Sequence, residues 1–556
     1  MINLIVISLQ FITVFLLGRT FYNLTNHFLL KNKNNLIFQL RPHNFYLLFG
    51  IFFIGNMTVL VNFFTGSDKE YFKFLIIFLI ILNLFFVRKP EINFSHLLQS
   101  FTIYIFLMIS TYNFGLSKDS DVYHLNNQLF IKEESIYFGL SNLHHRYGFS
   151  SLWEYILSNF WFGDNLIFLN TPNLIILFSL YFFILNFLKS KNYFFIKVSS
   201  LILVFGVLDN FGIGGGRNGF IGIDEIGAFD NSFAILFIIC SIFTIFLYVN
   251  DKNHLNEYFY LGVMILMLGQ IRYLGFIIFI PFLFKLIKEF NFKDYSSILC
   301  FGSVLTFIWF IKNIIISSCI IFPVYQTCLT NLNWHQKDQA KVVYLSIIGH
   351  PRNPNDIFLP RNNFSWINNW IDVNYSYLIN FILSLVVIKL FFYIKPTYKT
   401  FKSLLVSIFL FFFWFIFLPD YRFAPPVFLL ILLIINYDYL SSSKIVKIRI
   451  FQKTISGLII LFLCTFLTVR QDAYIKFYND PYKSLVIKTQ EIEYISRTGY
   501  FGVKPVNGKT CFLNRKCFPD DYEVVLEING LYKVFKPVKI DYWTNFLEDI
   551  RLKKSI

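Results

Sequence analysis

Acidic side chains that could do chemistry gather in one polar stretch, residues 112–154, which lies between two apolar runs. Within it, Asp119 and Asp121 form a D-x-D pair shortly after the first run. Two carboxylates this close together can supply a general base or hold a divalent cation against a phosphate. The pattern is short, so two solvated aspartates in a polar loop are the competing interpretation.

The same stretch is rich in histidine. His124 follows the aspartates, and SNLHHRYGF (141–149) places His144, His145 and Arg146 side by side. Arginine suits two-pronged contact with a phosphate, and histidine can move a proton near neutral pH. The spacing is not that of a metal site, and ordinary loop packing is the alternative. The stretch also contains the glutamates Glu133, Glu134 and Glu154.

Three basic residues stand at the ends of other apolar runs. Arg272 lies in GQIRYLG between two short runs, Lys312 lies in WFIKN, and Arg422 lies in LPDYRFAPP. A charge is costly in hydrocarbon, so such residues are functional candidates unless they only reach the headgroup layer. Together they would form a receptor for a lipid-linked phosphate or pyrophosphate.

A glycine-rich stretch, DNFGIGGGRNGFIGIDEIGAFDNS (209–232), offers further acids. It lacks the Lys-Ser/Thr ending of a Walker phosphate loop, and no strand precedes it. We expect a flexible loop. The secondary acidic candidates are Asp224 and Glu225 in this loop and Glu154 in the first.

The composition indicates that these residues are held by membrane-spanning helices. The 556 residues are 56% hydrophobic and 21% aromatic, above the roughly 45–50% apolar content of soluble domains. The formal charge of +16 is distributed over short loops between apolar runs. That distribution is the positive-inside pattern of a membrane protein and argues against nucleic-acid binding.

About 14 apolar runs approach the ~20 residues needed to cross a bilayer. They are 2–18, 44–65, 72–88, 97–114, 164–187, 196–212, 231–249, 257–269, 273–289, 295–315, 374–394, 403–419, 424–440 and 455–470. If 112–154 lies outside, every connection predicted inside is basic. The outer side then holds the 112–154 loop, 209–232, 269–275, 312–373, 418–426 and the tail from about residue 471.

The prediction is therefore an all-α polytopic membrane domain, residues 1–470, with outer loops 112–163, 209–230 and 312–373. Residues 149–162 suit an amphipathic helix lying in the interface as a roof, with Trp153 and Trp161 as anchors. Residues 471–556 form a small outer α+β tail, with two strands around an Asn529-Gly530 turn.

The seven cysteines contain no CxxC pair, which argues against zinc or thioredoxin chemistry. Cys511 and Cys517 are the leading candidates for a disulfide on the outer side, and Cys319 with Cys328 form a weaker second pair.

With these features, the chain resembles the GT-C superfamily of polytopic glycosyltransferases. More closely, it resembles an uncharacterised bacterial membrane family encoded among surface-polysaccharide genes. The similar patches are DVYHL (121–125), GLSNLHHRYGFSSLW (139–153), KNIIISSCIIFP (312–323) with NW (333–334), PDYRF (419–423) and CFLNRKCFP (511–519). In that family the turn at 269–275 more usually carries a lysine, and the glycine-rich loop does not align.

The resemblance implies an enzyme of the bacterial inner membrane whose active face is outside. A polyprenyl-phosphate sugar would be the donor, and a lipid-linked or surface glycan the acceptor. The acid of the first loop would be the catalytic base, which by position is Asp121 or Asp119. A divalent cation, Mg²⁺ or Mn²⁺, would fit beside that pair, and protein partners are unknown.

Two other functions fit the same sequence. An O-antigen-type polymerase or ligase would use histidine and arginine of 312–373 and would need no acidic base. A transporter or flippase for lipid-linked glycan would need ionisable groups along a path through the spans, and few are present.

Overall fold

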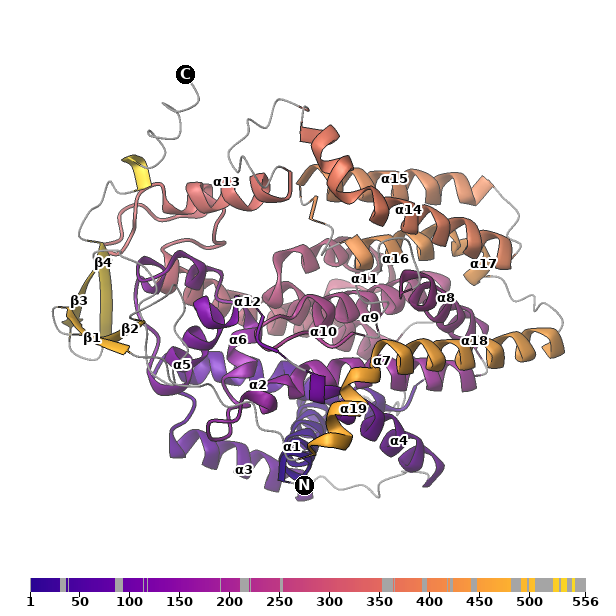
Figure 1. Cartoon of the computed structure of the whole chain (residues 1–556), viewed down its shortest axis with the longest axis horizontal. Coiled ribbons are helices and arrows are strands. Elements are labelled where there is room, and N and C mark those ends of the chain that lie inside the picture. Colours follow the sequence, from indigo (N-terminus) through magenta and orange to yellow (C-terminus); the bar gives the residue numbers. More distant parts are fainter. Residues whose placement is uncertain are drawn as a thin grey trace.

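The chain folds into a mostly helical body, seen in a computed structural model (Figure 1). The structure describes residues 2–30, 37–38, 40–85, 94–113, 115–117, 119–190, 192–210, 220, 222–250, 254–352, 364, 366–392, 398–417, 419–420, 424–441, 448–481, 492–497, 500–505, 524–529, 532–537 and 543–545. This part of the chain is mostly helical, as the sequence predicts.

The helices of the first half are α1 (Ile2–Thr25), α2 (Tyr46–Asn62), α3 (Glu70–Phe85), α4 (Phe94–Ser110), α5 (Leu125–Glu133), α6 (Leu152–Leu157), α7 (Thr171–Lys189), α8 (Tyr193–Asn210), α9 (Asp230–Val249) and α10 (Leu255–Ile271). Those that follow are α11 (Phe279–Glu289), α12 (Phe292–Ser317), α13 (Gln339–Arg352), α14 (Trp366–Phe392), α15 (Tyr398–Phe417), α16 (Ala424–Ile435), α17 (Tyr437–Ser441), α18 (Ile448–Val469) and α19 (Gln471–Asn479).

Each of the apolar runs read from the sequence overlaps one of these helices. Within the described residues, five helices are long and apolar enough to cross a membrane, or six if the bent pair α18 and α19 counts as one span. Five further apolar helices are shorter, at 10–17 residues. These helices indicate a membrane protein, and the expected number of about 14 spans is not confirmed in the part of the chain that the structure describes.

Close helix contacts are made where side chains are smallest. Gly18 of α1 and Gly50 of α2 face each other's helix, and a Cβ on either glycine would overlap the opposite backbone at Tyr46 or Val14. Small residues of this kind let membrane helices approach closely. Deeper in the bundle, Asn56 of α2 and Gln270 of α10 exchange amide hydrogen bonds of 3.2 and 2.9 Å.

One end of the bundle carries most of the irregular structure. In Figure 1, α9, α10, α12, α14, α15 and α18 run roughly along the long axis, and α5, α13 and the β-hairpins lie toward the left end. The first hairpin pairs β1 (Ile492–Arg497) with β2 (Tyr500–Pro505), and the second pairs β3 (Val524–Asn529) with β4 (Tyr532–Pro537), both antiparallel. The two strands expected around Asn529 are therefore confirmed.

One strand of the tail, β4, makes contacts with the first polar loop. Phe535 of β4 donates its backbone N–H to the Phe138 carbonyl at 2.8 Å, and the Phe138 N–H bonds the Lys533 carbonyl at 3.0 Å. The Lys533 ammonium also pairs with Glu134 at 2.5 Å. The Phe535 side chain is 1% exposed and stacks on Tyr137. Strand β4 thus packs directly against the first polar loop.

The helix expected at 149–162 is shorter than predicted and lies in the protein interior, not at the membrane interface. It is α6, only Leu152–Leu157, and all six of its residues are buried. Gly55 of α2 leaves the space in which Leu152 and Ile156 pack, since a Cβ there would lie 2.8 Å from Ile156. An interfacial roof with Trp153 at headgroup level is therefore wrong: Trp153 is 0% exposed, because protein surrounds the helix on every side.

Candidate functional site

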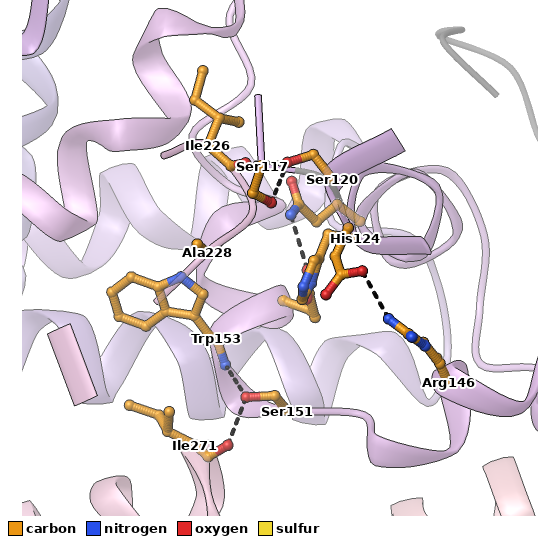
Figure 2. A network of polar contacts seen from close by, with 12 residues as sticks. Ser117, Ser120, His124, Arg146, Ser151, Trp153, Ile226, Ala228 and Ile271 are labelled. Carbon is orange, nitrogen blue, oxygen red and sulfur yellow. Dashed lines mark hydrogen bonds and ion pairs between the residues drawn. The ribbon is translucent and has the colours of Figure 1, made fainter. Parts of the chain in front are cut away.

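The first polar loop and the glycine-rich loop are tied together by their backbones. Leu116 and Ile226 form a parallel bridge, and the Ser117 N–H donates to the Ile226 carbonyl at 3.1 Å. The Ser120 hydroxyl donates to the same carbonyl and lies 2.7 Å from the Ser117 hydroxyl (Figure 2). Gly227 has φ +87° and lies against Ser120, where a Cβ would overlap the hydroxyl.

An outer layer of the site is formed by one aspartate and one arginine. The Arg146 guanidinium donates through Nη1 to Asp119 Oδ1 at 2.8 Å, the contact drawn from Arg146 in Figure 2. The same guanidinium lies over the Tyr123 ring, 5.0 Å from its centroid. Both side chains of the ion pair are partly exposed, 39% for Arg146 and 42% for Asp119, so the pair is open to solvent and to a ligand.

A buried layer lies beneath it. His124 bonds through Nδ1 to the Glu154 carboxylate, and Gln128 donates to the second oxygen of that carboxylate at 2.9 Å. The Trp161 indole in turn donates to Gln128 at 3.1 Å. His124 ends a single π-helical turn, Ser120–His124, that leads into α5, and Glu154 lies on α6. His124 is 6% exposed and Glu154 3%.

A second ion pair stands across from these layers. Arg272, which caps the C-terminus of α10, bonds through Nη2 to Asp230 in the first turn of α9. Its guanidinium lies over the Phe229 ring, 4.6 Å from the centroid. Phe229 also contacts the His124 ring edge-on at 6.0 Å. The two loops and the ends of α9 and α10 therefore meet at this phenylalanine.

Local structure explains why Arg272 is held there. The Ser151 hydroxyl donates to the Ile271 carbonyl at 2.9 Å and accepts the Trp153 N–H at 3.2 Å (Figure 2), which joins the start of α6 to the end of α10. After Arg272 the chain turns back on α10: a Cβ on Gly275 would lie 2.8 Å from the Leu268 carbonyl oxygen. The tight turn expected at 269–275 is confirmed.

Four charged side chains lie close to Tyr123. Its hydroxyl is buried, which raises the pKa of Tyr123, and nearby charges act on it as well. Those charges belong to Asp119, Arg146, Glu154 and Arg272. Four residues from the first loop, α6 and α10 thus surround one phenol.

The neighbouring histidines are neutral at physiological pH. Burial lowers the pKa of His145 to about 4, and the adjacent Arg146 adds to the effect. Burial also holds the pKa of His144 well below its usual range. His144 accepts the Arg146 N–H through Nδ1 at 3.3 Å, and the His145 ring meets Trp543 edge-on at 5.9 Å. Neutral rings of this kind can accept protons or hydrogen bonds but add no positive charge.

Asp224 serves first as a helix cap. Its carboxylate accepts the backbone N–H groups of Asn231 at 2.9 Å and Ser232 at 3.2 Å, in the first turn of α9. Burial, with the charge of Asp230 as the next cause, raises the pKa of Asp224 to about 7. Its neighbour Glu225 points into solvent and is exposed.

Lys312 is placed differently from the surface cation that the sequence led us to expect. It is 0% exposed, and its ammonium donates to the Ser150 carbonyl and, at 2.9 Å, to the Ser150 hydroxyl. The Trp309 ring centroid lies 3.1 Å from the ammonium. Ser150 has φ +36°, a left-handed conformation. Lys312 therefore holds the turn between Arg146 and α6.

Several expected site residues lie outside the described part of the chain. The structure places the backbone of Asp121 in the π-helical turn but does not describe its side chain. Arg422, Cys511 and Cys517 are wholly outside it. Among the described residues no three His, Cys, Asp or Glu side chains gather as a metal-binding group, and Mg²⁺ or Mn²⁺ stays a prediction.

Two features were missed or undervalued in the sequence. Asp230 was only one of several acids in its loop, yet it pairs with Arg272; a carboxylate at the start of an apolar helix was the available signal. Arg470, which precedes α19, lies close enough for Asp224 to act on its charge. The weaker disulfide prediction, Cys319 with Cys328, is confirmed.

The fold and the site define a helical membrane protein with charged side chains gathered where the first polar loop meets the ends of α9 and α10. The chain belongs to the family described as a domain of unknown function, DUF8201, whose family model matches residues 1–429. No curated protein and no solved structure shows a significant match to the chain.

Proposed function

We propose that the protein is an inverting glycosyltransferase of the GT-C kind. It would act on the outer face of a bacterial inner membrane and take a sugar from a polyprenyl phosphate. The acceptor would be a lipid-linked oligosaccharide or a surface glycan. The site would lie where the first loop meets the ends of α9 and α10.

The observation that carries the proposal is the pair of partly exposed guanidiniums around Tyr123 and Phe229. Arg146 and Arg272 each contact one carboxylate, Asp119 and Asp230 respectively. Guanidinium has five N–H donors, so each arginine can keep its aspartate and still bind a phosphate oxygen. Arg272 caps α10, whose residues 258–269 are apolar, which suits the depth of a lipid phosphate.

The chemistry needs two roles from these residues. As the bond from the anomeric carbon to the phosphate oxygen breaks, the leaving polyprenyl phosphate gains negative charge, and the arginines would stabilise it. A general base must remove the proton of the attacking hydroxyl on the opposite face of the sugar. The resemblance assigns that base to Asp121 or Asp119.

Substitution of the two aspartates tests the proposal. The purified protein is given a panel of radiolabelled short-chain polyprenyl-phosphate hexoses and pentoses, and release of polyprenyl phosphate is measured. Asp119→Asn should lower the rate on the order of tenfold or more, because Arg146 loses a charged partner. Asp121→Asn should lower it further if this carboxylate is the base. Wild-type rates in both variants would refute an acidic site in this loop.

Asp68→Asn is the matched control. Asp68 pairs with Lys73 at 3.1 Å and is 49% exposed, close to the 42% of Asp119. It lies beside the opposite end of α5, where its backbone N–H bonds Lys132. We expect Asp68→Asn to turn over donor at the wild-type rate.

The same assay separates the rival functions. A polymerase or ligase would consume pyrophosphate-linked oligosaccharide in place of the monophosphate sugars, and substitution of His335 in the 312–373 region would abolish its activity. A flippase would move labelled lipid across a vesicle membrane without consuming donor.

A further inference from the structure

We propose that His124, held by Glu154, takes the proton of the attacking hydroxyl. This inference rests on the sugar transfer proposed above and names a different base for it. Glu154 is then a positioning residue that acts through His124. Neither role follows from the acidic base that the resemblance implies.

The hydrogen bond between His124 and Glu154 decides which ring nitrogen carries the proton. The Glu154 carboxylate accepts at one oxygen from the Gln128 amide at 2.9 Å and at the other from His124 Nδ1. A carboxylate accepts hydrogen bonds and does not donate them when it is ionised. The proton of a neutral His124 therefore lies on Nδ1, and Nε2 carries the free lone pair.

The other ring nitrogen of His124, Nε2, is accessible. Within the described part of the chain, no hydrogen-bond partner of Nε2 is found. Some described polar atoms are fully enclosed and have no hydrogen-bond partner, and Nε2 is not one of them. Part of the 6% exposure of His124 therefore belongs to this nitrogen. An imidazole with its base atom reachable and its other nitrogen tied to a carboxylate is the arrangement that general-base histidines use.

The His124 ring lies between two aromatic rings of the site, Tyr123 and Phe229. Its centroid is 4.0 Å from that of Tyr123 and 6.0 Å from that of Phe229. On Phe229 also lies the Arg272 guanidinium, which would bind the phosphate. The base and the cation for the leaving group thus contact one shared aromatic ring.

Charged groups face the His124 ring from several elements. Glu154 on α6 contacts it directly. Arg272 and its partner Asp230 face it from α10 and α9 across Phe229, and Asp119 with Arg146 forms the layer above Tyr123. Each of these two ion pairs is neutral overall, and the Glu154 carboxylate is in direct contact with the ring.

Asp119 is less suited to the role. One of its oxygens already accepts a hydrogen bond from Arg146 at 2.8 Å. A carboxylate that neutralises a guanidinium holds the phosphate-binding residue in place, whereas His124 Nε2 has no hydrogen-bond partner among the described residues.

The hydroxyl proton of the acceptor moves to His124 Nε2 while the acceptor oxygen bonds to the anomeric carbon. The bond between that carbon and the phosphate oxygen breaks, and polyprenyl phosphate leaves with the electron pair. The imidazolium, paired with Glu154, then returns its proton to the phosphate or to water.

The test uses the full-length protein and the polyprenyl-phosphate sugar that wild type consumes fastest in the panel. His124→Gln should lower kcat by a factor on the order of 10² to 10⁴ with little change in KM for the donor. Glu154→Gln should lower kcat in the same direction. His254→Gln is the control, since His254 caps the far end of α10 beside its own glutamate, Glu257, and should not change the rate.

Rescue separates a proton-accepting role from a structural one. His124→Gly should regain activity with added imidazole, and substituted imidazoles should rescue in the order of their basicity. Gel filtration and the melting temperature report whether each variant is folded, and His124→Asn replaces His124→Gln if the latter does not fold.

Two results would overturn the inference. If His124→Gln keeps the wild-type kcat while Asp121→Asn is inactive, the base is the aspartate and the proposed function stands. If wild type consumes no donor of the panel, the proposed function and this inference fall together.

Discussion

The guanidinium of Arg272 pairs with the carboxylate of Asp230, and this one contact joins the last turn of α10 to the first turn of α9. Phe229, which precedes Asp230, lies under the same guanidinium and reaches the His124 ring. The pair therefore connects the membrane helices to the first polar loop. It is the centre of the proposed phosphate receptor.

Removal of the Arg272 charge should weaken donor binding. In Arg272→Gln, KM for the polyprenyl-phosphate sugar should rise on the order of 10- to 100-fold, because one charge-assisted contact contributes about 1.5–3 kcal/mol. The KM of Arg272→Lys should lie between those of wild type and Arg272→Gln, since lysine keeps the charge but loses the two-pronged geometry. Initial rates against donor concentration measure both. Arg41→Gln, an exposed arginine before α2, is the control, and an unchanged KM in Arg272→Gln would remove this residue from the site.

Strand β4 should be needed for the stability of the first loop. Phe535→Ala should cost about 3–5 kcal/mol, because a fully buried phenylalanine is truncated. Lys536→Ala, one residue along the strand on the opposite face, should cost much less. Denaturant unfolding in detergent gives the difference. Equal stability of the two variants would show that β4 does not pack on Tyr137 as described.

Asp224 should make the stability of the protein depend on pH. Its pKa is raised to about 7, first by burial and then by the charge of Asp230, whereas an unfolded chain releases this proton near pH ~3.9. The folded state thus binds the extra proton, and stability falls as pH rises from about 4 to 7. Melting temperatures at pH 5 and 8 should differ more in wild type than in Asp224→Asn. A pH dependence as steep in the variant would assign the effect to another group.

The Cys319–Cys328 disulfide gives a test of which side faces out. Its nine-residue separation corresponds to a stabilisation of about 2–3 kcal/mol by loop closure. Disulfides persist outside the cytoplasm, so protein from intact cells should react with maleimide at these cysteines only after reduction. Cys300→Ser, which removes an exposed free thiol, is the control that should leave the reduction-dependent labelling unchanged. Free thiols at Cys319 and Cys328 before reduction would place this loop inside.

The sequence was sufficient to locate the long apolar helices, because an apolar run of this length favours a helix, but α5, α13 and α19 lie outside every such run. It was also sufficient for the residue types of the site, since Arg146, Arg272 and His124 are out of place in an apolar chain. The sequence predicts the turn at 269–275 between two short apolar runs, and a Cβ on either of its glycines would overlap Phe276 or Leu268.

Pairing could not be read in the same way. Nothing local distinguishes Asp230 from Asp224, because the choice depends on where the end of α10 lies when the bundle is packed. Trp153 and Glu154 looked interfacial because their helix alternates apolar and polar residues. Two residues distant in sequence hold this helix in the interior: Gly55 leaves the space for Leu152 and Ile156, and Gln128 donates a hydrogen bond to Glu154.

Lys312 illustrates the same limit. A cation at the end of an apolar run is typical of a surface residue, yet its ammonium bonds Ser150 beneath the surface. The carbonyl that receives it is positioned by the left-handed turn at Ser150, a backbone feature with no signature in residue type.

The most direct measurement of the central claim is donor turnover by the wild-type protein in sealed vesicles. Radiolabelled polyprenyl-phosphate sugars are supplied with a lipid-linked glycan acceptor, and the labelled acceptor and free polyprenyl phosphate are quantified together. The account predicts that both appear in equal amounts, with inversion at the anomeric carbon. Movement of intact donor between leaflets with no polyprenyl phosphate released would contradict it.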